Sequence, residues 1–501
     1  MKVFFYFVLF PFLTYSQVQI GSDLNGEAID DNSGYNVSIS NNGNIVAVGA
    51  IWNDGNGSKS GHVRVYQNNS SIWSQIGSDI NGEAIDDHSG YSICLSNDGN
   101  IIAIGAPYNN NVNGSDSGHV RIYRNISNVW TQIGSDINGE ASNDLSGYSL
   151  SLSNNGNVMA VGAPNNDGNG NNSGHVRVYQ NNLDVWTQIG SDINGESAGD
   201  LFGLNVSLSD NGNIIAIGGP YNDGNGSDSG HVRIYRNNLG SWTQIGSDIN
   251  GESFGDRSGW YVSLSNDGNI VAIGAIDNNG NGTSSGHVRI YQNISNVWSQ
   301  VGSDINGEAI ADLSGLSISL SGDGNIIAIS ANRNDENGSD SGHVRIYQYI
   351  SNIWTQIGTD INGEAAGDWF GSNISLSNNG SVVIVGANRN DGNGIDSGHA
   401  RIFDLSAILN TINNIILDFN IFPNPVSEVL TIQLPDNIEF NKATIYNTLG
   451  QIIKVENSKI FSVKDLTNTT YFIEVETNKG KATKIFIKEW LNYLKIIIQI
   501  I

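Results

Sequence analysis

The chain has 501 residues, a formal net charge of −26 and charged side chains at only 14% of its positions. Glycine, asparagine and serine make up much of the polar remainder, which favours short strands and tight turns because these residues tolerate turn conformations. An acidic chain of this kind repels phosphate backbones and anionic membranes, so we expect no nucleic-acid partner. The single cysteine, Cys94, excludes an internal disulfide framework.

Residues 1–16 have the features of a secretory signal peptide. Lys2 precedes an apolar run, and small polar residues lead to a cleavage position after Ser16. The apolar run is too short to span a membrane. We therefore expect an exported protein that is secreted or attached to the outer cell surface.

A unit of 56 or 57 residues follows and recurs as far as residue 404. Each unit opens with the tripeptide GSD, which is GTD in the last one. These tripeptides begin at Gly21, Gly77, Gly134, Gly190, Gly246, Gly302 and Gly358. A second phrase, SGHVR or SGHAR, keeps the same rhythm. A fixed period of this length is typical of a solenoid, a propeller or an array.

Each unit predicts four strands and no helix. In the second unit, SGYSICLS alternates polar and apolar residues, as a strand does, and the hairpin turn NDGN follows it. NIIAIGAP indicates a strand buried on both faces, and GHVRIY and WTQIGSD supply the third and fourth strands. Four strands form a propeller blade, so we predict an all-β, seven-bladed β-propeller of four-stranded blades over residues 17–404.

The two ends of the array predict how the ring closes. A copy of the fourth strand, QVQIGSD, begins at Gln17, before any complete unit, and no copy follows Phe403. The N-terminal strand can therefore complete the seventh blade. This closure would remove an exposed sheet edge, which otherwise invites aggregation.

The repeats resemble FG-GAP repeats. LFGLNVSLSDNGNIIAIGGPYNDGNG begins at Leu201, and WFGSNISLSNNGSVVIVGAN begins at Trp369. The resemblance spans residues 17–404 and implies a seven-bladed ring with extracellular binding, as in the propeller heads of integrin α-chains. That family places calcium loops between the first two strands. This chain has only the short turn SNDGN there, beginning at Ser96, so those sites are not carried over.

Every unit carries the pattern D-x-N-G-E-x-x-x-D, which is similar to a calcium loop in its oxygen ligands and its glycine. In the second, third and fourth units the pattern consists of Asp79, Asn81, Glu83 and Asp87, of Asp136, Asn138, Glu140 and Asp144, and of Asp192, Asn194, Glu196 and Asp200. These residues and their equivalents are candidate Ca²⁺ ligands, and calcium is the one cofactor considered. The favoured alternative is a turn between blades, held by Asp and Asn side chains that bond nearby backbone.

A histidine, an arginine two positions later and a tryptophan recur at fixed places in the units. Gly118-His119 resembles the Gly-His pair of WD-repeat propellers, which implies a buried structural network rather than a ring of metal ligands. The arginines, such as Arg121, should pair with acidic residues of an adjacent strand or blade. The tryptophans, such as Trp130, should pack between blades.

A dedicated active site needs different groups in different roles, so it should lie where the repeats differ. The differing residues are Trp52, His88, Phe254, Arg257, Trp260, Arg333, Glu336, Trp369 and Arg389. They come from several units and include no nucleophile–base set, so we predict no catalytic residues. Trp52, Trp260 and Trp369 are the candidate ligand-binding residues, because exposed aromatic side chains are frequent binding hot spots.

After a linker at residues 405–418, residues 419–488 resemble the C-terminal sorting domain of the type IX secretion system of Bacteroidetes. The resemblance rests on Phe422-Pro423-Asn424-Pro425, on Tyr471-Phe472 and on the closing stretch to Lys488. It implies a small β-sandwich, contact with the type IX machinery and passage across the outer membrane. Thr470 replaces the glycine usual in the family, and an apolar tail of unknown role, residues 489–501, follows.

These features favour a secreted or surface-attached, non-catalytic binding or adhesion module whose ligand is an extracellular protein or glycan. We expect a monomer. One alternative is an enzyme that degrades an extracellular polysaccharide or protein at the central channel. The other is a calcium-stiffened surface scaffold without a specific ligand.

Overall fold

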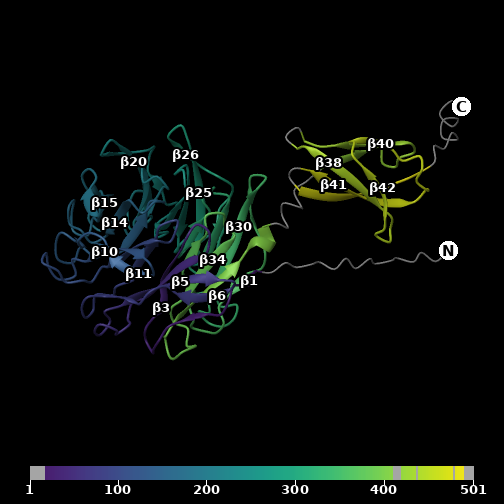
Figure 1. Cartoon of the computed structure of the whole chain (residues 1–501). Helices are drawn as coiled ribbons and strands as arrows, with labels where there is room; N and C mark the ends of the chain where they lie inside the picture. Colours follow the sequence, from purple (N-terminus) through teal and green to yellow (C-terminus); the bar gives the residue numbers. More distant parts are fainter. Residues whose placement is uncertain (1–16, 410–418, 436–437, 478–479, 490–501) are drawn as a thin grey trace. The chain divides into compact units, whose positions relative to one another are not determined.

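The computed structural model describes residues 17–409, 419–435, 438–477 and 480–489 (Figure 1). The predicted signal peptide, residues 410–418 of the linker and residues 490–501 of the tail lie outside the described residues. The chain divides into one unit that ends at Leu405 and another that begins at Ser406. No helix in the described ranges is long and apolar enough to cross a membrane.

The first unit is a closed ring of seven antiparallel sheets, the blades. The first strand of each blade contacts the first strands of both neighbouring blades, and β33 contacts β3, so the ring closes. These innermost strands are β3 (Ser33–Ile39), β8 (Ser92–Leu95), β13 (Ser149–Leu152), β18 (Asn205–Leu208), β23 (Ser258–Leu264), β28 (Ile318–Leu320) and β33 (Phe370–Leu376). They confirm the predicted seven-bladed propeller.

The second and third strands form the buried middle of each blade. The second strands are β4 (Ile45–Ala50), β9 (Ile101–Ala106), β14 (Val158–Ala163), β19 (Ile214–Gly219), β24 (Ile270–Ala275), β29 (Ile326–Ala331) and β34 (Val382–Ala387). The third strands are β5 (His62–Asn69), β10 (His119–Ile126), β15 (His175–Asn182), β20 (His231–Asn238), β25 (His287–Ile294), β30 (His343–Ile350) and β35 (His399–Asp404). In β9, Ile102, Ala103 and Ile104 are all buried, so this strand is covered on both faces, as its apolar run predicts.

The outer edge of each blade is a strand interrupted by a bend. The outer strands are β6 (Ile72–Gln75), β11 (Val129–Gln132), β16 (Val185–Gln188), β21 (Ser241–Gln244), β26 (Val297–Gln300) and β31 (Ile353–Gln356). Two-residue continuations pair with the same third strands: β7 (Ile80–Asn81), β12 (Ile137–Asn138), β17 (Ile193–Asn194), β22 (Ile249–Asn250), β27 (Ile305–Asn306) and β32 (Ile361–Asn362). The predicted fourth strand thus stops early, because Gly134 of the GSD tripeptide adopts φ +75° and a Cβ there would meet the Asp184 carbonyl oxygen at 2.9 Å.

The N-terminus completes the seventh blade, as predicted. β1 (Val18–Gln19) and β2 (Leu24–Asn25) both pair antiparallel with β35. Residues from opposite ends of the ring therefore share one sheet, and β35 has no open edge.

The hydrophobic cores lie between blades rather than within them. One cluster joins Val120 and Ile122 of β10 to Met159 and Val161 of β14 in the next blade. The repeated tryptophan adds a hydrogen bond across the same boundary, since Trp130 Nε1 donates to the Ile76 carbonyl oxygen of the previous repeat at 2.9 Å. A single blade could not bury its faces alone, which explains why the unit is repeated.

The second unit contains two sheets over one core. One sheet consists of β36 (Asn420–Phe422), β37 (Val429–Gln433) and β40 (Ile460–Ser462). The other consists of β39 (Ile452–Glu456), β38 (Phe440–Tyr446), β41 (Thr470–Thr477) and β42 (Gly480–Ile487). Leu430 of the first sheet and Ile445, Ile473 and Phe486 of the second share one buried cluster, so this unit is the predicted small β-sandwich.

Candidate functional site

The predicted calcium pattern lies where consecutive blades meet, and its acidic side chains face different histidines. Asp79 Oδ2 lies 3.7 Å from Nδ1 of His62 in its own blade. Glu83 instead reaches the next blade, where its carboxylate oxygens lie 3.8 Å from His119 Nδ1 and 3.5 Å from a terminal nitrogen of Arg121. One pattern therefore links two successive blades.

The last aspartate of the pattern closes its own turn. Asp87 Oδ2 accepts hydrogen bonds from the backbone N–H groups of Glu83 at 3.2 Å and Ala84 at 2.9 Å. The backbone carbonyl of Asn81 accepts a hydrogen bond from Arg121 at 2.7 Å. Equivalent places are taken by Asp136, Asn138, Glu140 and Asp144 in the third repeat and by Asp192, Asn194, Glu196 and Asp200 in the fourth.

The structure does not gather the four residues of one pattern around one point. It groups the glutamate that follows one blade with the histidine and aspartate of the next blade: ligand atoms of Glu83, His119 and Asp136 all lie within 4.8 Å of one another. Arg121 already brings positive charge to this group. Calcium binding by these residues stays a prediction.

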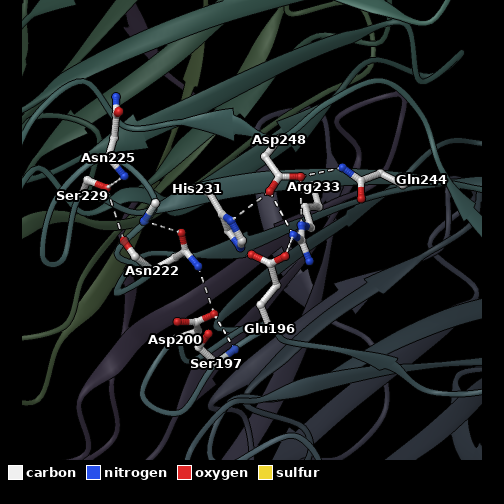
Figure 2. A network of polar contacts seen from close by, with 11 residues as sticks. Glu196, Ser197, Asp200, Asn222, Asn225, Ser229, His231, Arg233, Gln244 and Asp248 are labelled. Carbon is white, nitrogen blue, oxygen red and sulfur yellow. Dashed lines mark hydrogen bonds and ion pairs between the residues drawn. The ribbon is translucent and has the colours of Figure 1, made fainter.

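Figure 2 shows this arrangement in the fourth blade. Arg233 donates to both carboxylate oxygens of Asp248, at 3.0 and 2.9 Å, and also pairs with Glu196, which follows the preceding blade. Gln244 Nε2 donates to Asp248 at 2.6 Å. The ion pairs expected of the repeated arginine are thus confirmed, and they join one blade to the next.

The repeated histidines are buried in the same network. Burial, together with the nearby Arg121 guanidinium, lowers the pKa of His119 to about 4. The imidazole is therefore neutral at neutral pH. A neutral, buried ring fits the structural role predicted for these histidines.

One end of the central channel is narrowed by a closed ring of backbone hydrogen bonds. Each of seven residues, one from each blade, donates its N–H to the carbonyl of the next at 2.7–3.0 Å. The residues are Asn41, Asn97, Asn154, Asp210, Asn266, Gly322 and Asn378. They follow the C-terminal ends of the innermost strands, so the N-terminal ends of these strands surround the other mouth of the channel.

At that other mouth the repeats differ most. Three columns of the repeat alignment change chemical class from blade to blade there. The first column is Asn32, His88, Leu145, Leu201, Arg257, Leu313 and Trp369. The second is Tyr35, Tyr91, Tyr148, Leu204, Trp260, Leu316 and Ser372. The third is Trp52, Tyr108, Asn165, Tyr221, Asp277, Arg333 and Arg389.

Members of all three columns line one cavity of about 570 Å³. They include Arg257, Trp260, Arg333 and Trp369, which belong to three different blades. Cavities of this size hold small ligands or short polymer segments. The cavity shares lining residues with the channel behind it, so it is the open mouth of the ring.

Arginine and tryptophan dominate one side of the mouth. Arg389 lies over the Trp369 ring, with its guanidinium carbon 3.6 Å from the ring centroid, and Arg333 lies 5.7 Å from the same centroid. Arg257 pairs with Asp277 at 2.9 Å. These contacts hold the charged groups over flat aromatic faces.

Tyrosine dominates the other side. The rings of Tyr35 and Tyr91 lie 5.0 Å apart, and those of Tyr91 and Tyr148 lie 4.7 Å apart. Burial raises the pKa of Tyr91 well above its ordinary value, so this hydroxyl stays uncharged. The mouth thus combines neutral aromatic rings on one side with arginines on the other.

This convergence is the feature that sequence reasoning missed. The differing residues looked scattered along the chain because they are about one repeat apart, yet closure of the ring brings several of them together. Comparing the seven repeats column by column would have identified the columns. Of the predicted ligand-binding residues, Trp260 and Trp369 line the cavity, whereas Trp52 lies outside the lining, beneath Lys59.

Comparisons with known proteins agree with this architecture. The family model for the FG-GAP repeat matches residues 138–179, 194–235 and 362–403. The model for the secretion system C-terminal sorting domain matches residues 420–489. The chain carries FG-GAP repeats and a type IX sorting domain. The sorting domain marks proteins that are exported to the cell surface or the extracellular space.

Similar solved structures were also found for the FG-GAP propeller. A protein from Bacteroides uniformis described as a 6-phosphogluconolactonase has a TM-score of 0.48 and 13% identity, and the match covers 68% of this chain and 88% of that one. The periplasmic gluconolactonase PpgL from Pseudomonas aeruginosa has a TM-score of 0.46 and 14% identity, over 66% and 85% of the two chains. Values this low say nothing about activity. No curated protein matched the chain.

Proposed function

We propose that this FG-GAP propeller is a non-catalytic binding module that holds an extracellular ligand, a protein or a glycan, at the variable mouth of its channel. One observation carries the proposal: three columns that change chemical class between the repeats supply side chains that meet around one cavity. Positions that only stabilise blades keep the same residue in copy after copy. At the mouth the copies differ, as a surface specialised for one ligand requires.

The chemistry of the mouth supports binding rather than catalysis. Among the described residues that line the cavity, Asp277 is the one carboxylate, and it is already paired with Arg257. The described lining contains no histidine, cysteine or lysine. General acid–base or nucleophilic catalysis needs such groups close to one another. Aromatic and arginine side chains, in contrast, are the residues that contribute most often to binding hot spots.

The proposal is tested with arrays of glycans and extracellular matrix proteins, probed with the chain from residue 17 onward. A Trp260→Ala/Trp369→Ala variant should lose every specific signal. Trp52→Ala is the matched control, because Trp52 belongs to one of the three variable columns but does not line the cavity. Thermal unfolding verifies that all variants fold.

Two results would contradict the proposal. Signals that persist in the double variant would place the ligand elsewhere. Release of cleavage products from a bound polymer by the wild-type chain, lost in the double variant, would make the mouth an enzyme active site.

A further inference from the structure

We infer that the ligand held at the mouth is an acidic polysaccharide whose carboxylates pair with Arg333 and Arg389; this inference rests on the proposed binding function. The mouth is a basic spot on a chain with a net charge of −26. Of the few basic residues in the ring, Arg257, Arg333 and Arg389 lie together in the last three blades. A positive spot within an acidic body selects for an anion and orients it.

Two of these arginines are available to a ligand. Arg333 and Arg389 are exposed, and no carboxylate in the described ranges lies within 4.0 Å of either guanidinium. The repeated arginines, such as Arg345, are buried against glutamates that follow the preceding blade. Guanidinium groups bind carboxylates through two parallel hydrogen bonds. Arg257 is already neutralised by Asp277 and adds no free charge.

Two buried amides that line the same cavity each have an oxygen without a hydrogen-bond donor in the described part of the chain. Asn332 and Asn388 are 5% and 3% exposed and line the cavity, yet their Oδ1 atoms accept no hydrogen bond from any described residue. Leaving such an acceptor unsatisfied destabilises the folded chain. Carboxylate and phosphate groups only accept hydrogen bonds when ionised, so they cannot serve these atoms. A ligand hydroxyl can, once the amide turns this buried oxygen toward the cavity.

This pair of asparagines is itself a departure from the repeat. The same column holds an apolar residue in the other five blades: Ile51, Pro107, Pro164, Pro220 and Ile276. In this column asparagine therefore occurs only in the two blades that also carry Arg333 and Arg389. The anion-binding groups and the donor-seeking groups are neighbours in the chain; Arg333 lines the cavity with both asparagines, and Arg389 lies over the lining residue Trp369.

Aromatic side chains are the third group of residues that line the cavity. Trp260 and Trp369 on one side and Tyr91 and Tyr148 on the other line the cavity. The apolar C–H face of a sugar ring packs against the electron-rich face of an aromatic ring. A chain of uronic acids offers carboxylates, hydroxyl donors and apolar ring faces on every sugar. An acidic peptide offers one backbone donor per residue and no flat apolar face, so it fits less well.

The test measures binding of polygalacturonate and alginate to the chain from residue 17 onward, by calorimetry and by quenching of tryptophan fluorescence. Fully methyl-esterified polygalacturonate, dextran and poly-L-glutamate are the comparison probes. We expect both uronic-acid polymers to bind and the three comparison probes to bind at least about tenfold more weakly. The affinity for the uronic-acid polymers should fall as the salt concentration rises. Arg333→Gln/Arg389→Gln should weaken binding by about tenfold or more. Arg236→Gln, on a third strand and outside the mouth, is the matched control and should leave it unchanged.

A third variant separates recognition from folding. Asn332→Ile introduces the residue that Ile51 and Ile276 supply at the same position in other blades. It should weaken polygalacturonate binding by about fivefold or more and leave the unfolding midpoint equal or higher, because an unsatisfied acceptor has been removed.

Four results would overturn the inference. Equal affinity for the esterified polymer or for dextran would exclude a role for charge. Equal affinity for poly-L-glutamate would favour an acidic peptide. Failure of both uronic-acid polymers to bind would reject the ligand class. In each of these cases, loss of an array signal in Trp260→Ala/Trp369→Ala would still uphold the mouth as the binding site. Polygalacturonate binding that survives this double variant would overturn the inference and the proposed function together.

Discussion

The seven buried histidines of the ring predict that the propeller loses stability steeply in mild acid. The pKa is lowered by burial to about 4 for His62, His119, His175, His287, His343 and His399, and in the same direction for His231. The ordinary histidine pKa is 6.5. Between these values the unfolded chain binds protons that the folded chain does not. Stability is therefore complete above about pH 6.5 and is lost as the pH falls toward 4.

The size of the effect follows from the same values. A pKa lowered from 6.5 to about 4 corresponds to roughly 3 kcal/mol for one histidine. A folded domain is stable by about 5–15 kcal/mol, so protonation of a few histidines is enough to unfold the ring. With seven protons taken up, the free energy of unfolding should change by up to about 9 kcal/mol per pH unit. Glu83 and Glu308, whose pKa values burial raises, oppose this trend by a smaller amount.

The assay is urea unfolding followed by tryptophan fluorescence at closely spaced pH values between about 7 and 4.5. A His119→Leu/His175→Leu variant should lower the proton uptake on unfolding by two. Asp98→Asn is the control. Burial acts to raise the pKa of Asp98, but hydrogen bonds from Ser96 and Asn100 hold it below its ordinary value, so this group titrates outside the window. A stability that stays constant across the window, or an unchanged slope in the double variant, would refute the reasoning.

Four other outcomes are expected. Trp130→Phe, which removes the hydrogen bond to the Ile76 carbonyl but keeps an aromatic ring, should cost about 1 kcal/mol in urea unfolding, whereas Trp130→Ala should cost about 3–5 kcal/mol. Deletion of residues 17–25 should expose the edge of β35 and convert a monomer into aggregates on size-exclusion chromatography, although a folded monomer would show that the ring closes without β1 and β2. Because burial raises the pKa of Cys94 to about 11, the native thiol should react far more slowly with a disulfide reagent at about pH 8 than the thiol of the unfolded chain does. Cys94→Ser should change the free energy of unfolding by less than about 0.5 kcal/mol. Calcium should leave the unfolding midpoint unchanged relative to chelator, because an arginine already supplies the positive charge in each Glu–His–Asp cluster between blades. A calcium-dependent rise in the midpoint that Glu83→Gln reduces would instead support the predicted calcium sites.

Much of the architecture could be predicted from the sequence because it depends on periodic, local signals. The strand pattern of each repeat and the spare strand near Gln17 were enough to predict seven blades and their closure, which the pairing of β1 with β35 confirms. The place at which the outer strand ends was predicted less well. The turn at Gly134 depends on contact with Asp184 in the next blade, which no local pattern reports.

The calcium pattern shows a second limit. Its residues are close in sequence and similar in chemistry, which suggested one site per repeat. In the ring, Asp79 turns to the histidine of its own blade and Glu83 to the histidine of the next. Spacing along the chain does not determine which partner a side chain meets across a blade boundary.

The sequence by itself determined the repeat, the all-β class, the export signals and the residues in which the blades differ, because each of these depends only on the order of residues along the chain. Only the tertiary structure decided that these differences meet. Arg333 and Trp369 are 36 residues apart in sequence, and Arg257 is more distant still, yet all three line one cavity. The physical reason is that every blade presents its variable columns at the N-terminal end of an innermost strand, and closure of the ring brings those seven ends to a single mouth.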